Sequence, residues 1–111
     1  MKAHFGFIEK AEFGAFNKLI TSLKQKKEGN GSLLDNSMVL FGSNLGNANS
    51  HDTRNLPMIL AGGGFKHAGH LDLGTKDNTP MCNLFVQMLQ KLGMETASFG
   101  SSTSTSVPGL M

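Results

Sequence analysis

Most of the residues that could perform chemistry lie in one polar loop, residues 42–55, between two short apolar runs at residues 38–41 and 56–61. Such a loop at the end of a strand is where α/β proteins usually bind ligands. His51 and Asp52 are neighbours in it, and imidazole with carboxylate suits a divalent metal such as zinc, or proton transfer. Its other candidate site residues are polar: Ser43, Asn44, Arg54 and Asn55.

Two further histidines, His67 and His70, follow the glycine triplet Gly62–Gly64. If the two apolar runs pair as strands, these histidines and the His51–Asp52 pair leave strand ends near the same glycine-rich edge. The resulting hypothesis is a metal site made of these four residues. A His-x-x-His pair outside a helix has no fixed geometry, so the alternative is that the histidines are solvated or bond to neighbouring turns.

Arg54 has two possible uses, and the sequence favours neither. Its guanidinium could grip an oxyanion with two nitrogens, or it could pair with Asp52 or Asp35 and brace the loop. Ser43 does not stand in a Gly-x-Ser-x-Gly turn, so a hydrolase nucleophile has no support there. The glycine triplet lacks the Lys-Ser/Thr ending of a phosphate loop, and a sharp turn after the strand is the favoured interpretation.

Two helices are predicted around this loop. Residues 7–27 place apolar side chains at helical spacing, and the stretch 28–31, which contains two glycines, should end that helix. Gly14 inside it is interpreted as a close helix contact. Residues 80–92 form the second helix, with Thr79 as N-cap and Pro80 at the first helical position.

The apolar runs predict two strands, residues 37–41 and 56–61. Neither run alternates with polar residues, so both strands should be buried on both faces. The connection between them shows no helical period, which favours antiparallel pairing within a mixed sheet. Residues 1–97 should form a single α/β domain, and the Ser/Thr-rich tail, residues 98–111, should be extended or disordered.

Composition narrows the classes of partner. The chain has 111 residues and a net charge of +2 that is spread rather than clustered, which gives no case for nucleic acid. No apolar run approaches the ~18 residues of a membrane span, and no signal peptide is recognised at the N-terminus. Cys82 is the single cysteine. It falls in the first turn of the second helix, and a packed thiol is favoured over a nucleophile.

Several segments together resemble one family. They are residues 33–46 (LLDNSMVLFGSNLG), 49–57 (NSHDTRNLP), 60–67 (LAGGGFKH), 77–80 (DNTP) and 99–103 (FGSST). In these segments and in the helix 83–92 the chain resembles the C-terminal segment of the bacterial HXXSHH-motif proteins, a domain of unknown function. The resemblance covers nearly the whole chain from Phe7 onward.

Members of this family are longer, are exported through a twin-arginine signal and resemble the alkaline-phosphatase and sulfatase superfamily. The resemblance implies a partial three-layer α/β/α piece: a small mixed sheet flanked by helices. It also implies that the His-x-x-Ser-His-His motif lies in a missing N-terminal half. Where sulfatase-like enzymes carry Asp-His after the first strand, this chain has Ser43–Asn44.

Two functions are therefore carried forward. The first is the C-terminal part of an exported alkaline-phosphatase-like hydrolase that is not catalytic as this fragment, with a divalent metal such as zinc as its possible cofactor. The second is a noncatalytic binding or assembly module. On either hypothesis the fragment should form a homo-oligomer, because strands this apolar need cover. Whether the whole protein is an enzyme, and on which substrate, is left open by the residues.

Overall fold

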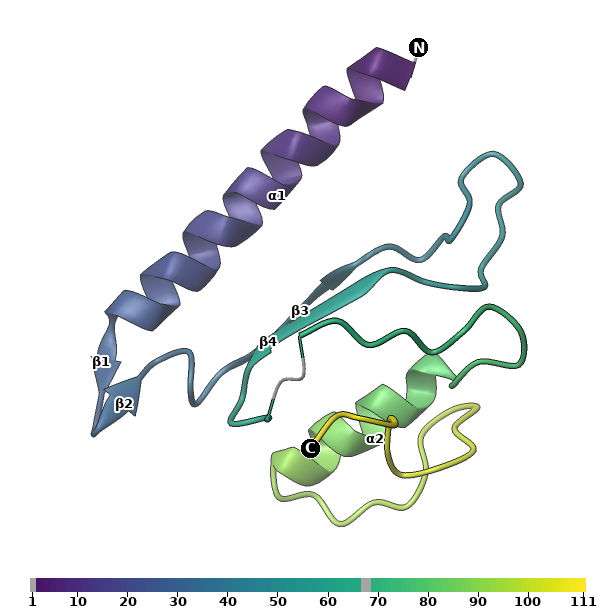
Figure 1. Ribbon diagram of the computed structural model, residues 1–111. Helices are drawn as coiled ribbons and strands as arrows, with labels where there is room; N and C mark the ends of the chain where they lie inside the picture. The colour runs from purple at the N-terminus through teal and green to yellow at the C-terminus, as the bar shows by residue number, and fades with distance from the viewer. Residues whose placement is uncertain (1, 67–68) are drawn as a thin grey trace. The chain divides into compact units, whose positions relative to one another are not determined.

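The computed structural model describes residues 2–66 and 69–111 (Figure 1). In chain order the elements are α1 (Lys2–Gln25), β1 (Lys27–Glu28), β2 (Gly31–Ser32), β3 (Met38–Gly42), β4 (Met58–Gly62) and α2 (Met81–Lys91). The strands form two separate two-stranded antiparallel sheets, β1–β2 and β3–β4, in place of the one mixed sheet that was expected. A mixed α/β class is therefore confirmed at this coarse level.

The chain divides into two compact units. The first comprises Met1–Phe41 and Leu60–Gly64, and the second comprises Gly42–Ile59 and Phe65–Met111. Neither helix in the described part of the chain has the length and apolar character needed to cross a membrane.

Helix α1 belongs to the first unit and starts five residues before its predicted bound. The Phe16 ring stacks on the Phe41 ring with centroids 4.8 Å apart, and the Phe13 ring meets Phe41 edge-on at 5.3 Å. Phe16, Ile20 and Leu23, at helical spacing, are half-buried. The close contact expected at Gly14 is wrong, because a Cβ built there meets nothing within 4 Å.

The segment after α1 is a hairpin, where the sequence predicted only the end of the helix. Lys27 pairs with Ser32 and Glu28 with Gly31. The Asp35 carboxylate accepts hydrogen bonds from the Ser32 backbone N–H at 2.7 Å and from its hydroxyl at 2.9 Å. These two bonds, the backbone one first, hold the pKa of Asp35 below its ordinary value.

Strands β3 and β4 lie within two residues of their predicted bounds, and their antiparallel pairing is confirmed (Figure 1). Their predicted burial on both faces is wrong: every residue of the two strands is half-buried or exposed. The predicted sharp turn after β4 is confirmed, because Gly62, Gly63 and Gly64 have φ angles of 77°, 70° and 68°. At Gly62 a Cβ would collide with the carbonyl oxygens of Leu34 and Ser37.

The second unit holds the buried hydrophobic residues of the described chain. They are Phe65, Leu84, Val86, Val107 and Leu110. Helix α2 supplies two of them and begins with Pro80 as N-cap and no side-chain capping bond, so the prediction of Thr79 as N-cap is wrong.

Polar side chains of α2 hold the C-terminal tail. Asn83 is 3% exposed, and its Oδ1 accepts from the backbone N–H of Thr103 at 2.9 Å and of Ser104 at 3.2 Å. One turn later, Gln87 accepts from the Val107 N–H at 2.9 Å and donates to the Leu110 carbonyl at 2.7 Å. The tail has no helix or strand, yet these bonds fix its backbone on α2.

Candidate functional site

The polar loop between β3 and β4 continues their hairpin to its tip. Asn47 and Asp52 form an isolated antiparallel bridge, in which the Asp52 N–H donates to the Asn47 carbonyl at 3.0 Å. The Gly46 N–H also donates to the Asp52 carbonyl, at 2.8 Å. A Cβ on Gly46 would collide with the Arg54 carbonyl oxygen, so only glycine fits this close approach.

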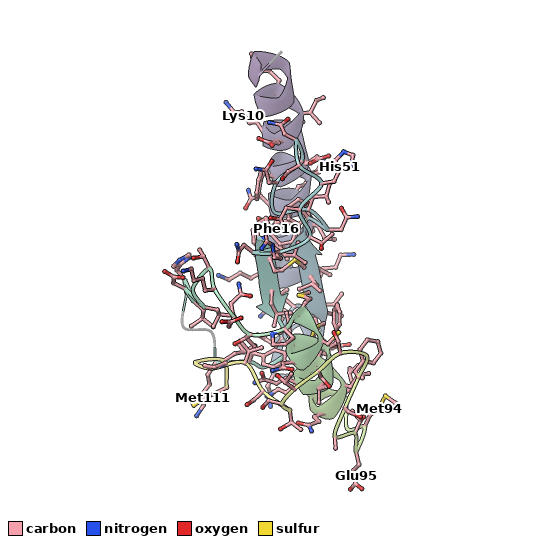
Figure 2. All side chains as sticks on the ribbon, turned by 90° about the vertical axis from the view of Figure 1, so that its right-hand side faces the viewer. Lys10, Phe16, His51, Met94, Glu95 and Met111 are labelled. Carbon is pink, nitrogen blue, oxygen red and sulfur yellow. The ribbon has the colours of Figure 1, made fainter. Side chains whose placement is uncertain are left out.

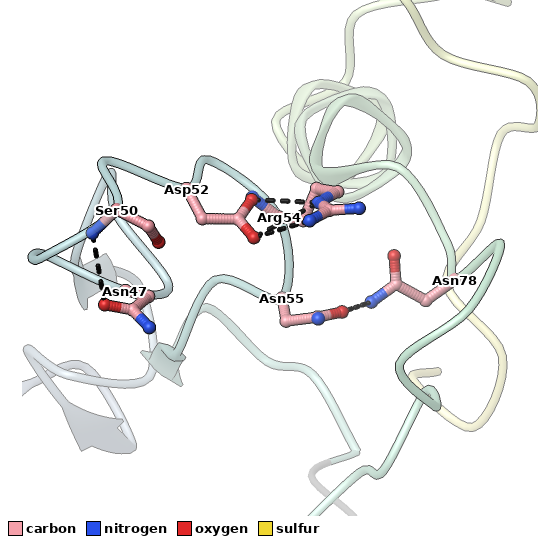
Figure 3. Close-up of polar contacts among 6 residues, drawn as sticks. All are labelled: Asn47, Ser50, Asp52, Arg54, Asn55 and Asn78. Atoms are coloured by element: carbon pink, nitrogen blue, oxygen red, sulfur yellow. Dashed lines mark hydrogen bonds and ion pairs between the residues drawn. The ribbon is translucent and has the colours of Figure 1, made fainter.

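Short polar side chains cap the turns of this loop. The Asn47 side-chain oxygen accepts from the backbone N–H of Asn49 at 3.0 Å. It also accepts from the backbone N–H of Ser50 at 3.4 Å (Figure 3). The candidate Ser43 accepts from the Leu45 N–H at 3.1 Å in the same manner. Each bond offers a loop N–H a partner that a strand ladder would otherwise supply.

Asp52 is bound to Arg54 through a two-pronged ion pair. Oδ1 lies 2.9 Å from Nε, Oδ2 lies 2.7 Å from Nη2, and Oδ1 also accepts from the Arg54 backbone N–H at 2.9 Å. Hydrogen bonds from the Arg54 side chain are the main reason that the pKa of Asp52 is lowered to about 2. Of the two uses left open for Arg54, the structure shows the brace with Asp52.

The predicted metal site is not assembled in the part of the chain that the structure describes. His51 stands exposed at the outer end of its loop with a φ of 52° (Figure 2), and His70 is exposed. His67 lies outside the described residues. Among those that are described, no three His, Cys, Asp or Glu side chains are grouped as metal ligands.

A second loop, residues 72–80, meets the polar loop at a cavity that the sequence did not reveal. The cavity has a volume of about 450 Å³ and is lined by Arg54, Asn55 and residues 75–78. The Asn78 side-chain N–H₂ donates to the Asn55 side-chain oxygen at 2.8 Å (Figure 3). It also donates to the Gly74 carbonyl at 3.1 Å. The only sequence signal was the Asp77–Asn78 pair, whose residue types tolerate positive φ.

Cys82 is half-buried at the start of α2. The Ser101 hydroxyl lies 3.5 Å from its Sγ, and hydrogen bonding from Ser101 lowers the pKa of the thiol. The partial burial agrees with the packed thiol that the sequence favoured, whereas the lowered pKa favours the thiolate, so the packed thiol stays a prediction.

No known protein family, characterised protein or solved structure significantly matches this chain. The resemblance to the HXXSHH-motif proteins therefore stays a prediction.

Proposed function

We propose that this chain is a noncatalytic assembly module, the C-terminal part of an exported alkaline-phosphatase-like protein with a three-layer α/β/α layout. One observation supports the assembly role above all others: helix α1 carries large apolar side chains that its own unit leaves in water.

Several large apolar side chains of α1 between residues 7 and 19 are exposed. Phe7 is 73% exposed, Ile8 55%, Phe13 51% and Leu19 49%. No side chain described in the first unit, from Gly6 onward, is buried. Full burial of one such side chain is worth about 1.5–3 kcal/mol, so covering Ile8 and Leu19, which lie on one side of the helix, would add to the stability of the unit.

The proposed cover is a second copy of α1, packed antiparallel. Ile8, Ala15 and Leu19 fall on one side of the helix, because they are separated by seven and four residues. A two-fold axis between Phe13 and Gly14 sets Ile8 against Leu19 of the other copy. Ala15, a small residue between Ile8 and Leu19 on this side, lets the helices approach closely.

Sedimentation equilibrium at micromolar concentration tests the assembly role. The wild-type chain is expected to be a dimer, and Ile8→Ser with Leu19→Ser is expected to be a monomer with unchanged helical circular dichroism. Lys10→Ser with Thr21→Ser, also on α1, is the matched control and should remain a dimer. A monomeric wild type at all concentrations would refute the second copy. The apolar side of α1 would then be left to pack against the N-terminal half that the family resemblance implies.

The state of the polar loop supports the noncatalytic part of the proposal. The Asp52 carboxylate is engaged by Arg54, and His51 stands exposed without a grouped set of ligands in the described residues. The expected result is no hydrolysis of p-nitrophenyl phosphate or p-nitrophenyl sulfate above the blank, with zinc, manganese or calcium added. Turnover that disappears in His51→Ala would overturn this part.

A further inference from the structure

We propose that the cavity lined by Arg54, Asn55 and residues 75–78 binds a small hydroxylated oxyanion, such as a phosphorylated or carboxylated polyol. Its walls are two loops of the second unit, and its volume of about 450 Å³ lies in the range of small-molecule sites. The cavity residues belong to the second unit and α1 to the first, so the proposal does not depend on the assembly role.

Arg54 provides the first anion contact. Its Nε and Nη2 are held by Asp52, while the side chain as a whole remains 80% exposed. Figure 3 shows the third guanidinium nitrogen directed away from Asp52. Because the carboxylate already fixes the guanidinium plane, little side-chain freedom remains to be lost when an oxyanion binds the outer edge.

Two turns with positive φ form part of the cavity wall. Three non-glycine residues in the described chain have positive φ, and two of them, Asn55 at 53° and Asp77 at 48°, line this cavity. Asn and Asp adopt such conformations readily in turns, so these two residues shape the cavity wall. The Asn78 amide joins the two loops by binding both Asn55 and the Gly74 carbonyl.

The mixture of lining groups indicates the class of ligand. Lys76 is a second cation beside Arg54, and Asp77 is the one carboxylate among the lining residues. With Asp52 included, the four charges cancel, so the attraction is short-range and the expected dissociation constant is about millimolar. Hydroxyl groups of a ligand could hydrogen-bond to Thr75, to Asp77 and to the side-chain amides of Asn55 and Asn78. An anion without hydroxyl groups would leave these protein groups unused.

The test is a titration of the intact chain, followed by proton–nitrogen NMR. The probes are glycerol phosphate, glycerate, inorganic phosphate and glycerol. Saturable shifts of the amides of residues 54–55 and 75–78 are expected with the two substituted polyols and weaker ones with inorganic phosphate. Whichever of glycerol phosphate and glycerate binds more tightly identifies the preferred oxyanion, phosphate or carboxylate. Equal shifts with glycerol, or none with any probe, would overturn the proposal.

Variants separate the site from general charge attraction. Lys76→Gln should raise the dissociation constant about tenfold, the size expected from losing one charge-assisted contact. Arg54→Lys keeps the charge but not the planar fork, and should weaken binding similarly. Lys66→Gln, an exposed lysine of the same unit that does not line the cavity, is the control and should bind as wild type. Equal weakening in Lys66→Gln and Lys76→Gln would show that only net charge matters.

Discussion

Asp52 and Arg54, separated by one residue, form a two-pronged ion pair, with Oδ2 2.7 Å from Nη2 and Oδ1 2.9 Å from Nε. The pair closes the polar loop just after the Asn47–Asp52 bridge. It uses the carboxylate that the sequence suggested as a metal ligand, and it holds the guanidinium at the cavity wall. One contact therefore weighs against the metal hypothesis and favours the anion hypothesis.

The first prediction concerns the titration of Asp52. Its folded-state pKa is depressed from 3.8 to about 2. A depressed pKa means that the pair contributes stability above pH 3.8, and that this contribution is lost as the pH falls through about 2. Carboxyl NMR shifts should give a midpoint near 2 in wild type and nearer 3.8 in Arg54→Gln. Identical midpoints in the two proteins would show that the pair does not persist in solution.

The second prediction concerns the tail. Asn83→Ala removes the acceptor for two backbone N–H groups and leaves them without that partner, so the second unit should lose about 1–3 kcal/mol. Hydrogen exchange at Thr103 and Ser104 should accelerate most. Gln90→Ala, which breaks one exposed bond to the Thr96 carbonyl, is the comparison and should cost much less. Unchanged exchange at Thr103 would mean that Asn83 does not hold the tail.

The third prediction contrasts two glycines. Gly62→Ala combines a φ of 77° with collision against two carbonyl oxygens, so it should destabilise the first unit. Gly14→Ala has open space inside α1 and should stabilise that helix by up to about 1 kcal/mol. Urea unfolding of the two variants should move in opposite directions. A stabilised Gly62→Ala would contradict the turn geometry.

The elements with strong periodicity were predictable from sequence. The helical spacing of apolar residues predicted α1 and α2, and the two apolar runs predicted β3 and β4. The predicted bounds of these elements lie within five residues of the observed ones. The β1–β2 hairpin was missed because two-residue strands are too short to show alternation. The burial of β3 and β4 was overestimated. An apolar run shows that burial would be favourable, but burial also needs other elements to pack on both faces of the strands.

The candidate site was predictable only where its contacts are local. Asn47 and Asp52 bond to residues two or three positions away, and such capping follows from residue type. The Asn55–Asn78 bond spans 23 residues, and no pattern in the sequence brings those two loops together. The cavity that they form therefore had to be seen in three dimensions.

The last prediction decides between the two functions carried from the sequence. An assembly module should contain no stoichiometric metal after purification and dialysis against zinc, since Asp52 is bound to Arg54 and His51 stands exposed. Metal analysis by mass spectrometry should give the same low content in wild type and in His51→Ala, with unchanged thermal stability. Asn49→Ala, in the same loop, controls for disturbance of the loop itself. One zinc per chain in wild type and in Asn49→Ala, lost in His51→Ala, would instead support a hydrolase part with His51 as a ligand. If both His51 and Asp52 bind the metal, the Asp52 carboxylate must release Arg54. The hydrogen exchange of the Arg54 Nε–H would then become faster, because this N–H loses its partner.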